Sequence, residues 1–375
     1  MIIRTVIIFL ILSLCTDLQA NSGQIHSVND KEKASSIFDS FYDDEKELSI
    51  TLVTDLDVLI NDRNREDYQD AQMIYENQNK EKIEWSVSAK PRGKFRRRIC
   101  DFPPVKLKFS KKELARAGLN DHNDLKLVTH CLADKQEGLD NVMREFLAYK
   151  LYNLLTPKSF RVQLVKIQYK DSKGKLRPIK RYGFLLEDTD EMAERLGGEE
   201  CSDCVNPDQS RMDSYEENML SVFQYMIGNA DWSLMMARNV KYVERPSGKL
   251  LAVPFDFDFS GLVDASYAVP NREYGQWSVQ NRVFMGFQPD EEVLFQTLYN
   301  FSQQKKALYA EVKKCKGLKA DTRNFINAYL DRFFYAIEHG TEEELLALFT
   351  PAVLQIPLTP SPDPVKLNTS GGIRK

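Results

Sequence analysis

The chain has 375 residues and an almost balanced charge, with 51 Lys and Arg against 55 Asp and Glu. This balance gives no reason to expect nucleic acid as a partner. Hydrophobic residues make up 42% of the chain, which is enough for the core of one large domain or of two.

Residues 1–20 are predicted to be a secretory signal peptide. Arg4 supplies a positive charge, an apolar run follows over residues 6–15, and Ala20 offers a small residue at a cleavage position. The run is shorter than the ~20 residues that cross a bilayer, and no transmembrane segment is expected after cleavage. We therefore expect an exported protein, periplasmic or secreted. A lipoprotein signal around Cys15 and an uncleaved anchor are the alternatives.

The first half of the remaining chain is predicted to be rich in strands. Residues 21–46 are polar and are expected to form a flexible arm. Strands are predicted where apolar and polar residues alternate or β-branched residues collect, and helices where apolar residues recur every three or four positions. The expected elements are strands over 48–59, 84–88, 105–109 and 125–129, a helix over 141–155, and a hairpin of 160–169 with 180–187.

The second half is predicted to be mostly helical. The expected helices cover 214–227, 291–298, 307–312 and 322–339, with a short hairpin of 240–243 and 250–254 among them. Prolines and small polar residues predict a disordered tail over 351–375. This distribution suggests a β-rich N-lobe over 47–190 and a helical C-lobe over 191–350.

Five cysteines follow the predicted signal peptide, and export permits disulfides among them. Cys100 and Cys131 each lie at the end of a predicted strand in the same lobe, which makes them one candidate pair. Cys201 and Cys204 form a CxxC sequence and are the alternative pair. A zinc site at this CxxC would need two more ligands. We expect at least one of the two pairs to be oxidised.

Polar residues in the second half are spaced as metal ligands and an acceptor-orienting group would be. Asp231 follows the end of a predicted helix, and Asn239 opens the next strand. Asp256 and Asp258 come directly after the strand that pairs with it, so the hairpin brings Asn239 near Asp256. Hard oxygen ligands of this kind suit Mg²⁺ that carries phosphates.

The two aspartates after the hairpin alternate with Phe255, Phe257 and Phe259. Carboxylates among aromatic side chains are expected to be partly buried, where an unpaired charge is costly. We therefore expect a metal ion or a basic side chain beside them. The alternative is that these Asp and Asn residues only cap backbone groups in turns.

The order GN-x-D-W, then Asn239, then P-x-D-x-D-x-S-G over residues 254–261, resembles the spore coat protein H (CotH) kinase family. The resemblance implies an α+β, two-lobed protein-kinase-like fold with a β-rich N-lobe and a mostly helical C-lobe. It also implies that Asp231 is the catalytic base and that Asn239 and Asp256 hold Mg²⁺ or Mn²⁺, with Asp258 as a further metal ligand. The interval from Asp231 to Asn239 is longer than is usual in kinases.

The first half contains a second part of this resemblance. Arg92 begins a basic, glycine-containing turn that leads to a lysine-bearing strand, and a guanidinium group can bind phosphate through two parallel hydrogen bonds. The resemblance implies that Lys106 contacts the α- and β-phosphates of ATP and that Glu145 pairs with this lysine. Lys108 and Lys126 are the alternatives to Lys106.

Together these features lead us to expect an exported phosphotransferase that depends on ATP and on Mg²⁺ or Mn²⁺. Its acceptor would be a hydroxyl group of a protein or a glycan. A catalytically inactive relative that binds partners at the envelope or cell surface is the first alternative. A metal-dependent hydrolase that uses the same carboxylates is the second.

Overall fold

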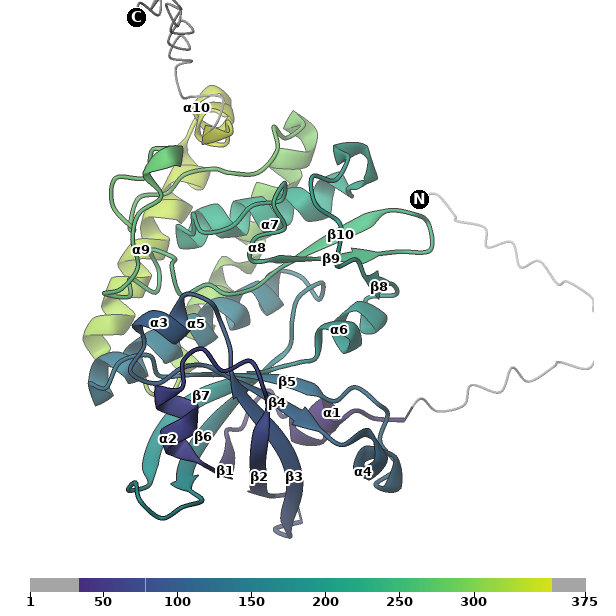
Figure 1. Ribbon diagram of the computed structural model, residues 1–375. Helices are drawn as coiled ribbons and strands as arrows, with labels where there is room; N and C mark the ends of the chain where they lie inside the picture. The colour runs from purple at the N-terminus through teal and green to yellow at the C-terminus, as the bar shows by residue number, and fades with distance from the viewer. Residues whose placement is uncertain (1–33, 78, 353–375) are drawn as a thin grey trace, which may run out of the picture. The chain divides into compact units, whose positions relative to one another are not determined.

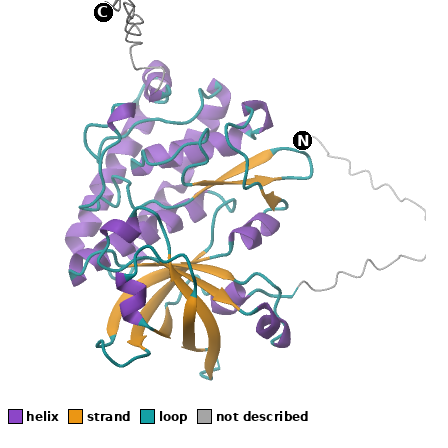
Figure 2. Cartoon of the chain, viewed as in Figure 1, coloured by secondary structure: helices purple, strands orange, loops and turns teal. Residues whose placement is uncertain are grey.

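The computed structural model describes residues 34–77 and 79–352. The predicted signal peptide, the beginning of the predicted arm and almost all of the predicted tail lie outside these residues. Figure 1 shows the described elements in chain order, and Figure 2 separates helices from strands.

Seven strands form a closed barrel in the order β1-β2-β3-β4-β5-β7-β6. Their bounds are β1 Leu48–Thr54, β2 Gln69–Glu76, β3 Lys82–Pro91, β4 Val105–Phe109, β5 Asp124–Thr129, β6 Val162–Asp171 and β7 Ile179–Leu186. Neighbouring strands are antiparallel except β1 and β6, which are parallel, with Leu48 opposite Val165 and Thr54 opposite Asp171. This parallel pairing closes the barrel.

Two short helices flank the first strand. Helix α1 (Ile37–Phe41) begins with a capping box formed by Ser36, and both Ile37 and Phe38 are fully buried in the barrel core. The part of the predicted arm that the structure describes is therefore packed against the barrel core. Helix α2 (Leu56–Asn61) occupies the second half of the strand predicted over 48–59, because the Asp55 side chain accepts a hydrogen bond from the Val58 N–H and so starts a helix.

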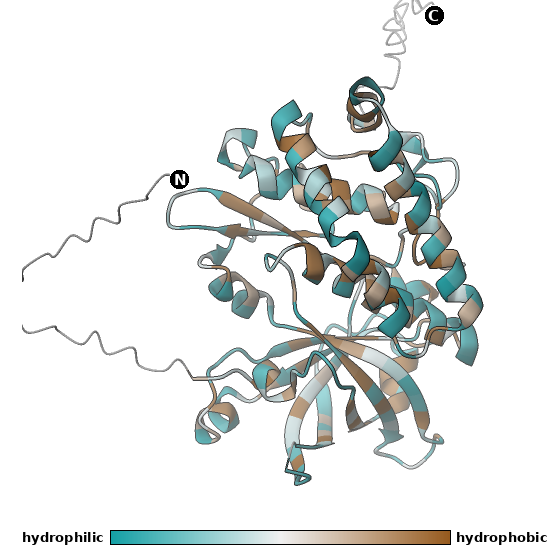
Figure 3. Cartoon of the chain, turned by 180° about the vertical axis from the view of Figure 1, so that it is seen from behind, coloured by the Kyte–Doolittle hydropathy of each residue, from teal (hydrophilic) through white to brown (hydrophobic). Residues whose placement is uncertain are grey.

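Of the eight remaining α-helices in the described residues, four contain the predicted helices, and four short ones were not predicted. The eight are α3 Arg96–Ile99, α4 Lys111–Arg116, α5 Lys135–Leu155, α6 Thr189–Arg195, α7 Ser214–Ile227, α8 Glu291–Lys314, α9 Ala320–His339 and α10 Glu342–Leu348. Helix α8 joins the two helices predicted over 291–298 and 307–312. Seen from behind, the long helices carry hydrophilic and hydrophobic stretches side by side, as amphipathic helices on a core do (Figure 3).

A second sheet has the order β10-β9-β8, with β8 Glu199–Glu200, β9 Val240–Glu244 and β10 Leu250–Pro254. Strands β9 and β10 are the predicted hairpin, and Pro254 lies opposite Val240. Helix α7 packs against β10 and ends at Gly228, whose φ of 67° is the left-handed conformation common at helix ends. The hairpin and the end of α7 together position the loops that carry the predicted site.

The expected α+β, two-lobed protein-kinase-like fold, with a β-sheet N-lobe and a helical C-lobe, is wrong. The strands of the first half close into a seven-stranded mixed barrel, and the helices accompany this barrel. Val128, Leu164 and Phe184 of the barrel share one apolar core with Met219 and Leu330 of α7 and α9. The described residues from Ser35 onward belong to a single compact unit. Barrel closure depends on the pairing of β1 with β6, two strands far apart in sequence, and no local pattern reveals it.

Both candidate cysteine pairs form disulfides. Cys100–Cys131 joins the end of α3 to the residues after β5, and Cys201–Cys204 closes the loop after β8. Cys315 is the free cysteine among those described, and it is buried. Within the described residues, no helix combines the length and the apolar character that a membrane span requires.

Candidate functional site

Three carboxylates from two distant parts of the chain surround one buried guanidinium group. Glu145 lies on α5, and Asp256 and Asp258 follow β10; their oxygens approach within 4.8 Å of one another. Arg96 of α3 donates from Nη2 to Glu145 Oε2 at 3.0 Å and to Asp256 Oδ1 at 3.1 Å. Its Nε donates to Asp258 Oδ2 at 2.8 Å. We call Glu145, Asp256 and Asp258 the carboxylate cluster.

Contacts on both sides of Arg96 explain its position. The preceding residue, Phe95, packs edge-on against Phe259 with 5.3 Å between ring centroids. Phe259 directly follows Asp258 in the chain. The Cys100–Cys131 disulfide ties the other end of α3 to the barrel. Although Arg96 is one of three consecutive arginines, it alone of them is buried. These tertiary contacts therefore determine that Arg96, and not its two neighbours, turns inward.

The β9–β10 hairpin brings two of the predicted metal ligands to the same place. The Phe255 N–H donates to the Asn239 carbonyl at 3.0 Å, so that Asn239 and Asp256 lie just beyond the paired strands. Both adopt left-handed backbone conformations, with φ of 51° and 64°. Such conformations are uncommon outside glycine and collect at functional sites. Asp256 is held by its N–H, which donates to Tyr149 Oη at 2.8 Å.

Asp231 is fixed by its neighbours on the loop after α7. The Asn239 side chain donates from Nδ2 to the Asp231 carbonyl at 2.5 Å and to Asp231 Oδ2 at 3.0 Å. Asn229 Oδ1 accepts a hydrogen bond from the Asp231 N–H at 3.0 Å, and Arg238 Nη1 lies 3.6 Å from Asp231 Oδ1. Asn239 therefore orients Asp231. The Asp231 side chain remains 37% exposed.

Negative charge exceeds positive charge in this region. Burial raises the pKa of Glu145 and of Asp258, and although the Arg96 charge lowers both, the neighbouring carboxylates raise them further. Burial also raises the pKa of Asp231, with Arg238 opposing and the charges of Asp256 and Asp258 adding to the rise. One guanidinium cannot neutralise three carboxylates, and the raised pKa values mean that either protonation or a further cation stabilises the carboxylate cluster.

One oxygen of the carboxylate cluster is left without a partner. Glu145 is 2% exposed, and its Oε1 atom has no hydrogen-bond partner among the described residues. Asp258, by contrast, also receives a hydrogen bond from the Tyr267 hydroxyl. A buried carboxylate oxygen without a donor is costly. The free oxygen points to a ligand that the carboxylate cluster can accept.

Basic side chains lie near Phe255. Lys126 of β5 donates from Nζ to Thr189 Oγ1 at 2.7 Å, and its ammonium lies 5.6 Å from the centroid of Phe255, the residue before Asp256. Burial, with the charges of Arg92 and Lys241 adding to it, lowers the pKa of Lys126 to about 7. We call Arg92, Lys126 and Lys241 the cationic group. These charges repel one another and so favour an anion, although Lys241 is already paired with Glu200.

The predicted pair of Lys106 with Glu145 does not form. Lys106 lies 2.9 Å from Asp124 on the neighbouring strand, and the Lys108 ammonium lies 5.8 Å from the centroid of Tyr68. In the described part of the chain Glu145 is paired with Arg96, which the sequence reasoning missed. The run of three arginines after Gly93 was the available signal, but it could not show which of them turns inward.

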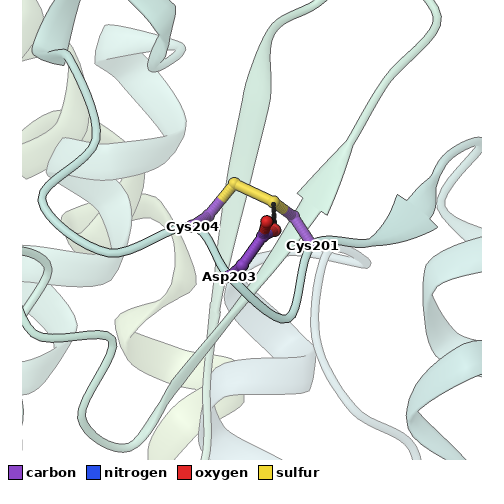
Figure 4. Close-up of side chains that lie close together, drawn as sticks. All are labelled: Cys201, Asp203 and Cys204. Atoms are coloured by element: carbon purple, nitrogen blue, oxygen red, sulfur yellow. Dashed lines mark hydrogen bonds between the residues drawn. A yellow bond between two sulfur atoms is a disulfide. The ribbon is translucent and has the colours of Figure 1, made fainter.

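One large hollow and a second group of possible metal ligands lie away from the predicted site residues. A hollow of about 910 Å³ lies over β1, β2, β6 and β7 and includes none of the predicted site residues. Cys201, Asp203 and Cys204 lie close together, but the two sulfurs are bonded to each other (Figure 4). Because a metal needs thiolate ligands, the oxidised pair does not offer a zinc site.

Comparison with models of known protein families gives no match to this chain. Comparison with curated proteins gives no significant match either. The chemistry of the carboxylate cluster, the cationic group and Asp231 is therefore the basis for a proposed function.

Proposed function

We propose that the protein is a phosphotransferase that uses ATP and a divalent metal ion. The observation that carries this proposal is the carboxylate cluster, with excess negative charge, beside a cationic group, with Asp231 partly exposed nearby. Phosphoryl transfer requires these three parts: metal ligands, positive charge at the phosphates and a group that orients the attacking hydroxyl. The resemblance of the motifs around Asp231 and Asp256 to the CotH kinase family supports the same chemistry.

The donor set of the carboxylate cluster fits Mg²⁺ or Mn²⁺. Its ligand atoms are carboxylate oxygens, which these cations prefer, and Glu145 has an oxygen to spare. Asp256 is the most exposed of the three proposed ligands, with 33% of its side chain accessible. When bound, the metal would neutralise charge on the phosphates. The carboxylate cluster would hold the metal and so keep the phosphates at a fixed position relative to Asp231.

The cationic group would receive the phosphates. Lys126 takes the role predicted for Lys106, because Lys106 is already paired with Asp124. An approaching phosphate would raise the pKa of Lys126 and restore its full charge. Arg92, which has the bidentate geometry suited to phosphate, lies near enough to influence Tyr149 and Lys126. These contacts would fix the nucleotide before transfer.

Asp231 would accept a hydrogen bond from the acceptor hydroxyl, and then its proton as the hydroxyl oxygen bonds to the γ-phosphorus of ATP and the bond from that phosphorus to the departing ADP breaks. Asn239 and Arg238 keep the carboxylate oriented. The hydroxyl would belong to a protein or a glycan outside the cytoplasm, in line with the predicted signal peptide.

The test is nucleotide-dependent stabilisation followed by an activity assay. ATP with Mg²⁺ or Mn²⁺ should raise the melting temperature, since a ligand that binds only the folded state stabilises it. Asp256→Asn should abolish this rise without unfolding the protein, whereas Asp121→Asn, an exposed aspartate paired with Lys111, should leave it intact. Stabilisation that persists in Asp256→Asn would contradict the metal assignment.

One observation favours the inactive alternative. Arg96 already places a positive charge within the carboxylate cluster, as a metal-free binding protein would need. The two functions differ in turnover: incubation with labelled ATP and a panel of proteins and glycans transfers phosphate only if the site is catalytic. Phosphate release without any acceptor would instead identify a hydrolase.

A further inference from the structure

Arg96 stands where a metal ion coordinated by the carboxylate cluster would stand. Its Nη2 atom is 3.0 Å from a Glu145 oxygen and 3.1 Å from an Asp256 oxygen, while Nε is 2.8 Å from an Asp258 oxygen. The guanidinium thus bridges the same three groups that would coordinate a divalent cation. Carboxylate oxygens lie about 2.0–2.6 Å from Mg²⁺ or Ca²⁺, so such an ion and the guanidinium cannot both occupy this place.

We propose that Arg96 is a built-in competitor for the divalent cation, and that Glu145 joins Asp256 and Asp258 as a metal ligand once the guanidinium leaves. This inference rests on the proposed function only in that it concerns the same metal. It makes a metal ligand of Glu145, which was expected from the sequence to pair with a lysine. It also makes metal binding conditional on movement of Arg96.

The assignment of Glu145 has independent support in its second oxygen. Arg96 binds Oε2 of Glu145, while Oε1 is buried and has no partner among the described residues. A metal ion can take the free oxygen, or both, because carboxylates bind such ions through one or two atoms.

The surroundings of Arg96 allow it to move. Helix α3 spans only Arg96–Ile99 and lacks a side-chain cap at its start. Its flanking residues Phe95 and Ile99 are 38% and 39% exposed. A rotation of this helix would have to break the Phe95–Phe259 contact and the hydrogen bonds from Arg63 to the Arg97 and Arg98 carbonyls, but it would move neither flanking side chain out of a buried position. The Cys100–Cys131 disulfide holds the far end and would act as the pivot.

Displacement also gives the guanidinium a new partner. A metal ion that arrives with a nucleotide brings phosphate oxygens next to the carboxylate cluster, and phosphate is a strong acceptor for arginine. Metal and nucleotide should therefore bind together more readily than the metal alone. In the absence of nucleotide, Arg96 is expected to keep metal affinity low.

The decisive experiment is a Mn²⁺ titration by calorimetry without nucleotide. Arg96→Met removes the competing charge but keeps a side chain of similar reach, and it should bind Mn²⁺ about tenfold more tightly than the unaltered protein, or more. Arg98→Met, an exposed residue of the same helix, removes the same charge and should bind Mn²⁺ as the unaltered protein does. Adding Glu145→Gln to Arg96→Met should reverse the gain.

Stability supplies a second readout, because Arg96→Met leaves two buried carboxylates, Glu145 and Asp258, and the partly buried Asp256 without their counter-ion. The variant should melt lower than the unaltered protein in EDTA and recover with Mn²⁺ alone. Mn²⁺ affinity that is unchanged, or that rises equally in Arg98→Met, overturns the proposal. If Arg96→Met does not fold even with Mn²⁺, Arg96→Lys decides: its single ammonium bridges fewer carboxylates, and affinity no higher than that of the unaltered protein rejects the competition.

Because no nucleotide is present, the outcome is separate from phosphotransfer. A protein that binds Mn²⁺ in this way but transfers no phosphate refutes the proposed function alone.

Discussion

Asp231 has backbone and side-chain contacts that can be separated by substitution. Its N–H and carbonyl are bound by Asn229 and Asn239, and these bonds do not require the carboxylate. Asp231→Ala should therefore keep the loop in place. We expect turnover to fall by about 100-fold or more, with ATP and metal affinity nearly unchanged, because a base acts in the transfer step.

Single-turnover transfer and calorimetric nucleotide binding, measured on the same preparations, check this prediction. An unfolded Asp231→Ala protein would mean that Asp231 serves the turn, and full activity would exclude it as the base. Asp121→Ala provides the control.

Lys126 makes stability depend on pH in a defined direction. Its pKa is lowered from 10.5 to about 7 in the folded protein, chiefly by burial and then by Arg92 and Lys241. Between these two values the unfolded chain holds a proton that the folded chain lacks. The free energy of unfolding should therefore rise with pH across this window through this residue, and the full cost of the buried charge is present below about pH 7.

Urea unfolding of Lys126→Met at several pH values from 7 upward should show a smaller rise than the unaltered protein. Lys173→Met, in the exposed turn after β6, should leave the slope unchanged. Nucleotide binding at pH 8 should also take up a proton, which calorimetry in buffers of different ionisation enthalpy detects. An identical pH slope in Lys126→Met would place the titrating group elsewhere.

At the scale of the element, the end of α7 determines where the Asp231 loop begins. Gly228 has φ of 67°, and a Cβ atom built there would lie 2.0 Å from the hydroxyl oxygen of Tyr329. That hydroxyl is held by a 3.0 Å hydrogen bond to the Gln280 carbonyl, so it cannot easily yield. Gly228→Ala therefore combines backbone strain with overpacking.

We expect Gly228→Ala to lower the free energy of unfolding by about 2–4 kcal/mol, the sum of a strained alanine and a core clash. Gly174→Ala is the matched control. It has a similar φ of 68°, and none of the described atoms lies within 4 Å of its added Cβ, so only the strain should remain, about 1 kcal/mol. Equal losses in both variants, measured by urea unfolding, would show that Tyr329 yields.

Most elements could be predicted because their signals are local. The helix over 214–227 is confirmed, and so is the hairpin that leads to Asp256. Strand β2 (Gln69–Glu76) was missed because its polar residues dilute the alternation. The predicted break before residue 307 disappeared because the polar stretch there continues α8 on an exposed face. Periodicity identifies a buried stripe but not the length of a solvated helix.

At the scale of the whole molecule, the segment before β1 connects the barrel with α6. Phe38 is fully buried and lies under the Arg161 guanidinium, 5.0 Å from its ring centroid, while Ser36 donates to Glu191 Oε1 at 2.7 Å. Phe38→Ala should lower the free energy of unfolding by about 3–5 kcal/mol, as other buried phenylalanines do. Tyr335→Ala, at a side chain that is 67% exposed, should change it little.

Denaturant unfolding of the two variants checks this prediction. A loss in Phe38→Ala no larger than that in Tyr335→Ala would mean that residues 35–46 do not pack on the barrel, as first expected for an arm.

The sequence by itself determined the local parts of the candidate site. Asp231 after a helix end, and Asn239 and Asp256 at the two strands of a hairpin, are brought together by neighbouring elements, so spacing and periodicity sufficed. The two disulfide pairs were also among the predicted possibilities.

Only the tertiary structure decided the closure of the barrel and the partner of Glu145. Both depend on contacts between residues far apart in the chain: β1 with β6 in one case, and Arg96 with Glu145 and Asp258 in the other. Such contacts are selected by the packing of the whole core, because neither the burial of one arginine nor the pairing of two distant strands lowers the free energy until the intervening chain has folded.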